Sequence, residues 1–152
     1  MYDLDELYQE IVLDHNRRPR NFKVLDEANR SSEGFNPLCG DQITLYLQLE
    51  DDGTISDVGF QAVGCAISKA AASMMTQSIK GKSQKQAREI FEAFRRMVTL
   101  GEEQDTDSDT LGDLFVLAGV SRYPARVKCA TLSWHTLQEA LNGKRDRPTS
   151  TE

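Results

Sequence analysis

The hydrophobic and polar positions along this chain predict a helix, then a β-hairpin, then several more helices. Residues 4–13 place apolar side chains at helical spacing, and Pro19 limits how far this first helix can run. Residues 15–37 are mostly polar and are punctuated by Pro and Gly, which indicates a long ordered loop.

The next stretch alternates apolar and polar residues with the period of a strand. Residues 43–50 and 54–63 show this alternation on either side of an Asp-Asp-Gly turn. An alternating strand presents one face to a core and the other to solvent. The two segments therefore predict a hairpin with one buried face.

After Gly64 the apolar spacing changes to that of helices. Cys65 is expected at or next to the first turn of an Ala- and Met-rich helix, and Cys129 near the start of the last helix. Four segments after Gly64 carry the helical pattern: residues 65–79, 84–98, 111–120 and 123–141. The segment 111–120 is expected to form a short helix that ends at Gly119, and an extended stretch is expected to precede the last helix.

The chain of 152 residues is long enough for one domain with its own core. We expect this domain to span residues 1–143. The acidic segment 101–109 is predicted to be a surface insertion. Residues 144–152 have no apolar side chain to dock them and are predicted to be disordered.

Charge and hydropathy narrow the class of protein. A formal net charge of −6 argues against a nucleic-acid partner, because phosphates require a clustered basic surface. No segment approaches the roughly 18 apolar residues of a membrane span, and the first residues are acidic rather than a basic leader. We expect a cytoplasmic protein without a membrane partner, whose Arg- and Lys-rich segments HNRRPRNFK and RYPARVK contact another protein.

The cysteines carry the candidate chemistry. An odd number of them, spread through a chain without an export signal, argues against a disulfide framework. They could be buried structural thiols, a reactive thiol, or thiolates gathered on a metal. Position must decide between these three readings for Cys39, Cys65 and Cys129.

Cys39 and Asp41 face one side if the chain between them is extended, and Gly40 lets the backbone bend closely there. Cys65 and Cys129 would arrive from helix starts, where the dipole favours a thiolate. Three thiolates and one carboxylate would satisfy a tetrahedral zinc ion, although Asp41 could instead cap a turn. On coordination chemistry alone, the hard carboxylate is the more labile ligand.

Neither histidine is expected to join such a site. His15, near the end of the first helix, is predicted to be a favourable cation there or a partner contact. His135 lies six residues beyond Cys129 in the sequence, on a different face of the last helix. We expect an exposed helix residue at this position.

The chain strongly resembles the IscU/SufU/NifU-N-terminal family of iron–sulfur cluster assembly proteins. The resemblance rests on the segments LDHNRRPRNF, NPLCGDQI, GCAISKAAASMM and LAGVSRYPARVKCATLSWHTL. It implies an α+β, IscU-like fold, with a small antiparallel sheet of about three strands packed against several helices. It also implies the metal ligands, which are Cys39, Asp41, Cys65 and Cys129.

Two features favour the SufU branch of the family. In IscU-type scaffolds a His directly precedes the last Cys, whereas Lys128 holds that position here. The interval between Cys65 and Cys129 is also long, as is typical of SufU-like members. That branch implies a zinc-dependent sulfurtransferase in iron–sulfur cluster biogenesis, which accepts persulfide sulfur from a SufS-type cysteine desulfurase and activates that enzyme.

In this branch a desulfurase His replaces Cys39 on zinc, and Cys39 becomes the implied catalytic acceptor. Because a carboxylate cannot carry a persulfide, we prefer Cys39 to Asp41 as the exchanging ligand. The sulfur would pass to a downstream iron–sulfur scaffold or apo-protein acceptor. Arg126 and Lys128 are the predicted partner contacts.

The resemblance also leaves a scaffold open as the alternative. Such a protein would assemble and transfer a [2Fe–2S] cluster, or hold Fe²⁺, on the same ligands, and it would not be an enzyme. A purely structural zinc domain used for docking is a third, weaker interpretation.

Overall fold

The computed structural model describes residues 4–37, 40–100, 111, 112, 114, 117, 120, 123–142 and 149–150. The elements, in chain order, are α1 (Leu4–Arg17), β1 (Arg30–Asn36), β2 (Asp41–Leu49), β3 (Ile55–Val63), α2 (Ala66–Ile79), α3 (Gln84–Leu100), α5 (Pro124–Leu141) and β4 (Thr149–Ser150).

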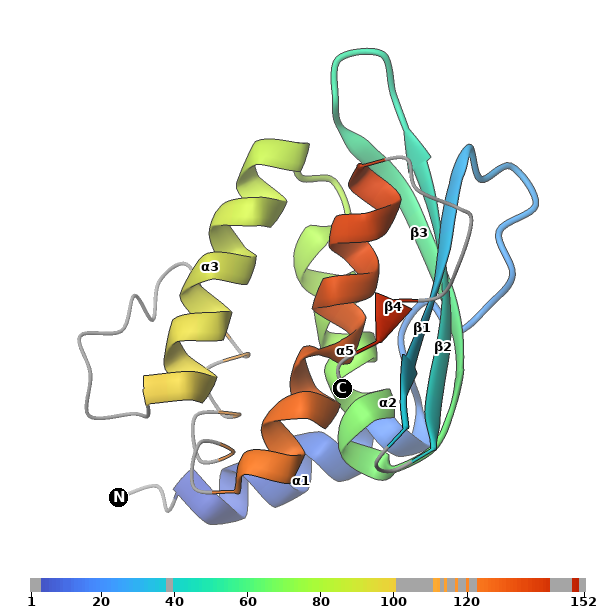
Figure 1. Cartoon of the computed structure of the whole chain (residues 1–152). Coiled ribbons are helices and arrows are strands. Elements are labelled where there is room, and N and C mark those ends of the chain that lie inside the picture. The colour runs from blue at the N-terminus through green and yellow to red at the C-terminus, as the bar shows by residue number, and fades with distance from the viewer. Residues whose placement is uncertain are drawn as a thin grey trace.

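Helices cover one face of a small sheet (Figure 1). The strand order is β3-β2-β1-β4, in which β1, β2 and β3 are antiparallel and the two-residue β4 runs parallel to β1. The expected α+β architecture, a small antiparallel sheet against several helices, is therefore confirmed. None of the described helices is long and apolar enough to cross a membrane.

The predicted hairpin is confirmed as β2 and β3. Along β2 every second residue is buried, from Leu49 back through the aliphatic residues to Asp41 at the start of the strand. Asp41 therefore lies on the same face of β2 as the buried aliphatic residues. Its carboxylate faces the side of the sheet that the helices cover.

The predicted long loop contains a strand that hydrophobic alternation did not reveal. In β1 the core-facing residues are Ser32, Gly34 and Asn36, which are small or polar. Backbone hydrogen bonding to β2 forms this strand, from the pair Arg30 and Leu47 to the pair Asn36 and Asp41. Period-two patterning fails here because the buried face of β1 is not apolar.

Strand β1 packs closely along one stripe of α5. The Ser32 hydroxyl donates to the Thr136 carbonyl oxygen at 2.6 Å. A Cβ on Gly34 would meet Thr136 Oγ1 at 2.0 Å and Leu132 Cδ1 at 3.1 Å, so only glycine permits this approach. Because Gly34 has no side chain, α5 can lie close to β1 at this point.

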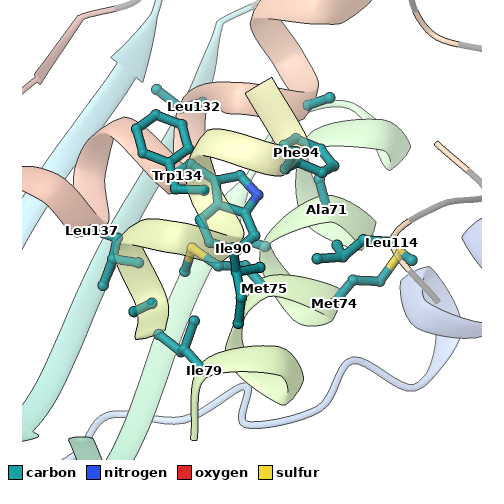
Figure 2. Close-up of a cluster of buried hydrophobic side chains, with 14 of the residues drawn as sticks. Ala71, Met74, Met75, Ile79, Ile90, Phe94, Leu114, Leu132, Trp134 and Leu137 are labelled. Atoms are coloured by element: carbon teal, nitrogen blue, oxygen red, sulfur yellow. The ribbon is translucent and has the colours of Figure 1, made fainter. Parts of the chain in front are cut away.

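The helices share an aromatic core on their own side of the sheet. Trp134 of α5 stacks on Phe91 and Phe94 of α3, with ring centroids 5.7 and 5.4 Å apart. Figure 2 shows Trp134 and Phe94 among Met74, Met75 and other apolar side chains of the cluster. This core fixes α5 against α2 and α3.

Both histidines lie differently from the sequence expectation. His15 is buried, and its Nδ1 lies 2.7 Å from the Ser73 hydroxyl of α2. The same hydroxyl accepts from the Arg20 amide at 2.8 Å, so the chain after α1 is tied to α2. His135 is half-buried with its ring edge-on to Phe91, and burial lowers its pKa.

Two other expectations concern segments at the edge of the description. Thr149 and Ser150 of the predicted disordered tail form β4 and pair with Gly34 and Phe35, and the other residues of 144–152 lie outside the described residues. The predicted insertion 101–109 lies outside the described residues. Within 111–120, the described apolar residues are buried: Leu111, Leu114, Leu117 and Val120.

Replacing Gly34 should show how strongly the fold depends on this close approach. Gly34→Ala should lower the free energy of unfolding by about 1–3 kcal/mol, because the new Cβ overpacks against Thr136. Chemical denaturation measures the change. Adding Thr136→Ala should recover part of the loss, and a double variant no more stable than Gly34→Ala would contradict this explanation.

Candidate metal site

The structure brings three of the four sequence-predicted ligands together. A carboxylate oxygen of Asp41 and the Sγ atoms of Cys65 and Cys129 all lie within 4.8 Å of one another. They come from β2, from the start of α2 and from α5, three elements far apart in sequence. The fourth predicted ligand, Cys39, lies outside the described residues.

Asp41 is held firmly at this site. Its side chain is fully buried, and Oδ1 accepts a hydrogen bond from the Cys65 amide at 2.7 Å. Its Oδ2 lies 3.7 Å from Cys65 Sγ. This hydrogen bond joins β2 to the start of α2, so Asp41 does more than cap a local turn. Coordination chemistry alone made Asp41 the more labile ligand, whereas its surroundings hold this carboxylate in place.

Cys65 is the N-cap residue of α2, as its position after Gly64 predicted. Its Sγ accepts a hydrogen bond from the Ser68 amide at 3.4 Å. In the metal-free protein, a hydrogen bond from Cys129 and the donors at the start of α2 lower the pKa of Cys65 to about 7. Burial and the nearby Asp41 carboxylate oppose this shift.

Cys129 occupies a different position in its helix from the one expected. Helix α5 begins at Pro124, so Cys129 lies more than one turn inside it rather than at its start. The unpaired amides and the dipole of a helix terminus therefore act on Cys65 and much less on Cys129. Cys129 is also almost completely buried, with 3% of its surface exposed.

Gly64 makes room for the Asp41 carboxylate. Its φ is +134°, which side-chain-bearing residues rarely adopt, and an added Cβ would lie 2.2 Å from Asp41 Oδ1. The turn into α2 can therefore place the Cys65 amide against Asp41 only with glycine at this position.

Sequence reasoning missed Asn36, which reaches the same site. The side chain is fully buried, and its Nδ2 lies 3.4 Å from Asp41 Oδ2 and 3.7 Å from Cys129 Sγ. Asn36 sits three residues before Cys39, at the end of the polar stretch 15–37 that the sequence predicts as a loop. Because Asn36 belongs to strand β1 and pairs with Asp41 of β2, its side chain faces the helices.

The two predicted partner contacts lie on the early turns of α5. Arg126 is exposed, and its guanidinium lies over the Tyr123 ring, 4.7 Å from the centroid. Lys128 is half-buried and directly precedes Cys129. Tyr123 itself is 51% exposed, so it and Arg126 form an exposed aromatic and basic pair at the start of the helix that carries Cys129.

The fold and site together define a small α+β protein with a buried cluster of one carboxylate and two thiols. Residues 7–130 match the family described as the NifU-like N terminal domain. The chain belongs to this family, as its sequence segments indicated, and several of its relatives are named as iron–sulfur cluster assembly scaffold proteins.

Several relatives are similar over most of their length. The zinc-dependent sulfurtransferase SufU of Bacillus subtilis is 45% identical, covering 91% of this chain and 92% of its own. The iron–sulfur cluster assembly scaffold protein IscU of Streptococcus pyogenes is 40% identical, covering 91% and 84%. A Fervidobacterium islandicum crystal structure, described as a cluster assembly scaffold protein for the SUF system, has a TM-score of 0.82 at 34% identity and covers 90% and 97%.

The thiol of Cys65 should titrate early in the metal-free protein. Because its pKa is lowered from 9.0 to about 7, its alkylation rate should reach half-maximum near pH 7. Peptide-resolved mass spectrometry after timed alkylation measures this. Cys129→Ala should move the midpoint upwards by removing the hydrogen bond, and a wild-type midpoint near pH 9 would contradict the expectation.

Replacing Gly64 should damage the ligand cluster itself. Gly64→Ala should weaken zinc binding by about tenfold or more, because the new Cβ displaces Asp41. Competition with a chromophoric chelator measures the affinity. Gly81→Ala is the matched control, since Gly81 also has a positive φ of +84° but nothing within 4 Å of an added Cβ. Equal zinc affinity in the two variants would refute the role of Gly64.

Proposed function

We propose that this protein is a zinc-dependent sulfurtransferase that accepts persulfide sulfur from a SufS-type cysteine desulfurase and activates that enzyme. The observation that carries the proposal is the meeting of Asp41, Cys65 and Cys129, with Cys39 two residues from Asp41. The name of the Bacillus subtilis relative supports the same function.

The donor set fits zinc. Zinc takes four ligands in structural sites and accepts both sulfur and carboxylate oxygen. Cys39, Asp41, Cys65 and Cys129 would fill all four positions and leave none open for a catalytic water. Bound zinc would keep the thiolates deprotonated and shielded from oxidation until a partner displaces one of them.

The described residues divide the work of holding such an ion. Asp41 and Cys129 are buried and anchored by neighbouring elements, whereas Cys65 is half-buried at a helix start. Their combined negative charge is offset by amide donors, among them those of Cys65 and Ser68. Cys39 is the remaining ligand, and we propose that it is the one that leaves the metal to accept the persulfide sulfur.

The transfer step needs only thiol–persulfide exchange. The Cys39 thiolate attacks the terminal sulfur of the desulfurase persulfide, and a new sulfur–sulfur bond forms on Cys39. The bond within the donor persulfide breaks, and the donor cysteine leaves as a thiolate. No external oxidant or reductant is required, since one persulfide replaces another.

The proposed partner surface includes the early turns of α5. Arg126 is exposed three residues before Cys129 and is held over Tyr123, from which it can reach an acidic group on the desulfurase. Lys128 adds a second positive charge on the same turns of α5. The sulfur would then pass to a downstream iron–sulfur scaffold or apo-protein, and we place this exchange in the cytoplasm.

A desulfurase assay tests the proposal. Adding the zinc-loaded protein to a SufS-type desulfurase with cysteine and a reductant should raise sulfide production, and Cys39→Ala should abolish the rise, because the acceptor thiolate is gone. Peptide mass spectrometry during turnover should find the persulfide on Cys39. No stimulation by the wild type would refute the function.

A cluster scaffold is the second candidate, because relatives from Streptococcus pyogenes and Thermotoga maritima are named as IscU scaffold proteins. In this alternative a [2Fe–2S] cluster or Fe²⁺ would occupy the same ligands as cargo. Anaerobic reconstitution followed by transfer to an apo-ferredoxin separates the two functions. Zinc that excludes iron, together with desulfurase stimulation, would reject the scaffold.

A further inference from the structure

Asn36 ends β1 at the point where the sheet meets the ligand cluster. It is the register partner of Asp41 on β2, and both side chains are fully buried. Its side chain points between β2 and α5, the elements that supply Asp41 and Cys129. The Asn36 amide therefore contacts one side chain from each of these two elements.

We propose that Asn36 is a positioning residue of the metal site, whose side-chain amide holds Asp41 and Cys129 at ligand separation by donating to each. The proposal rests on the metal site put forward above. The Nδ2 atom lies 3.4 Å from Asp41 Oδ2 and 3.7 Å from Cys129 Sγ. An amide nitrogen carries two hydrogens, so each acceptor can take its own.

The contact with Asp41 completes the orientation of its carboxylate. Oδ1 is already engaged by the Cys65 amide at 2.7 Å, and Oδ2 faces both Asn36 and the thiol of Cys65. Asn36 thus acts on the oxygen that is turned towards the sulfur atoms. Neighbours that hydrogen-bond to ligands in this way fix ligand geometry and tune metal affinity.

An amide suits this position chemically. Thiolates and a carboxylate concentrate negative charge in a buried place, which needs donors that stay in place. The asparagine amide donates without competing as a strong ligand and without a titration of its own near neutral pH. It acts on the two most buried of the three described ligands, Asp41 at 0% and Cys129 at 3% exposure, and steadies them while another ligand exchanges.

Zinc competition measurements on variants test the proposal. Asn36→Ala and Asn36→Asp should each weaken zinc binding by about tenfold to a hundredfold, because both remove the donors and the aspartate adds negative charge. Ser32→Ala is the matched control: Ser32 is another buried polar residue on β1, and it donates to Thr136 away from the metal ligands. This control should lose stability but keep its zinc affinity within about twofold.

NMR of the wild type gives a test that does not depend on a variant folding. When NMR-active cadmium replaces zinc, the Asn36 side-chain amide signals should shift and couple to the metal through Cys129 Sγ. The Asn29 side-chain amide, which donates to the Leu49 carbonyl oxygen at 2.8 Å away from the cluster, should remain unchanged. Unchanged Asn36 signals, or zinc affinity in Asn36→Ala equal to that of Ser32→Ala, would overturn the proposal.

The outcomes separate this inference from the proposed function. Tight zinc binding that depends on Asn36, without desulfurase stimulation, would support the positioning role and refute the sulfurtransferase. Desulfurase stimulation together with zinc binding that is independent of Asn36 would support the sulfurtransferase and refute the positioning role. A wild type that binds neither zinc nor cadmium would refute both.

Discussion

The hydrogen bond from the Cys65 amide to the fully buried Asp41 carboxylate is the constraint on which the site depends. It joins the first residue of β2 to the N-cap of α2, and it exists because Gly64 leaves room for it. A buried carboxylate is costly unless it is hydrogen-bonded, so its surroundings must supply donors. The Cys65 amide that satisfies Asp41 also places Cys65 beside it. The same hydrogen bond therefore stabilises the fold and sets the geometry of the ligand cluster.

The third ligand arrives through a different kind of contact. Strand β1 can lie against α5 because its buried face is small and polar, with Gly34 facing Thr136 and Ser32 bonded to the Thr136 carbonyl. This close packing carries Cys129 towards the end of β1, where Asn36 reaches it. An apolar β1 with large side chains would hold the helix further away, and the cysteine with it.

The sequence predicted those parts of the fold in which burial and hydrophobicity coincide. The hairpin, α2 and α3 follow from apolar spacing, and the expected position of Cys65 at the start of α2 is confirmed. Strand β1 was missed because backbone pairing with β2, rather than side-chain hydrophobicity, defines it. His15 was misjudged because only tertiary packing places Ser73 against its ring.

The sequence by itself determined the donor types and the family. Cys39, Asp41, Cys65 and Cys129 could be named as a ligand set from their motifs, because these segments carry the family resemblance. Only the tertiary structure decided that Asp41, Cys65 and Cys129 meet, how deeply these three are buried, and that Asn36 contacts two of them. The reason is physical: residue identity fixes what a side chain can bind, whereas strand register and the approach of a helix fix the distances over which it can act.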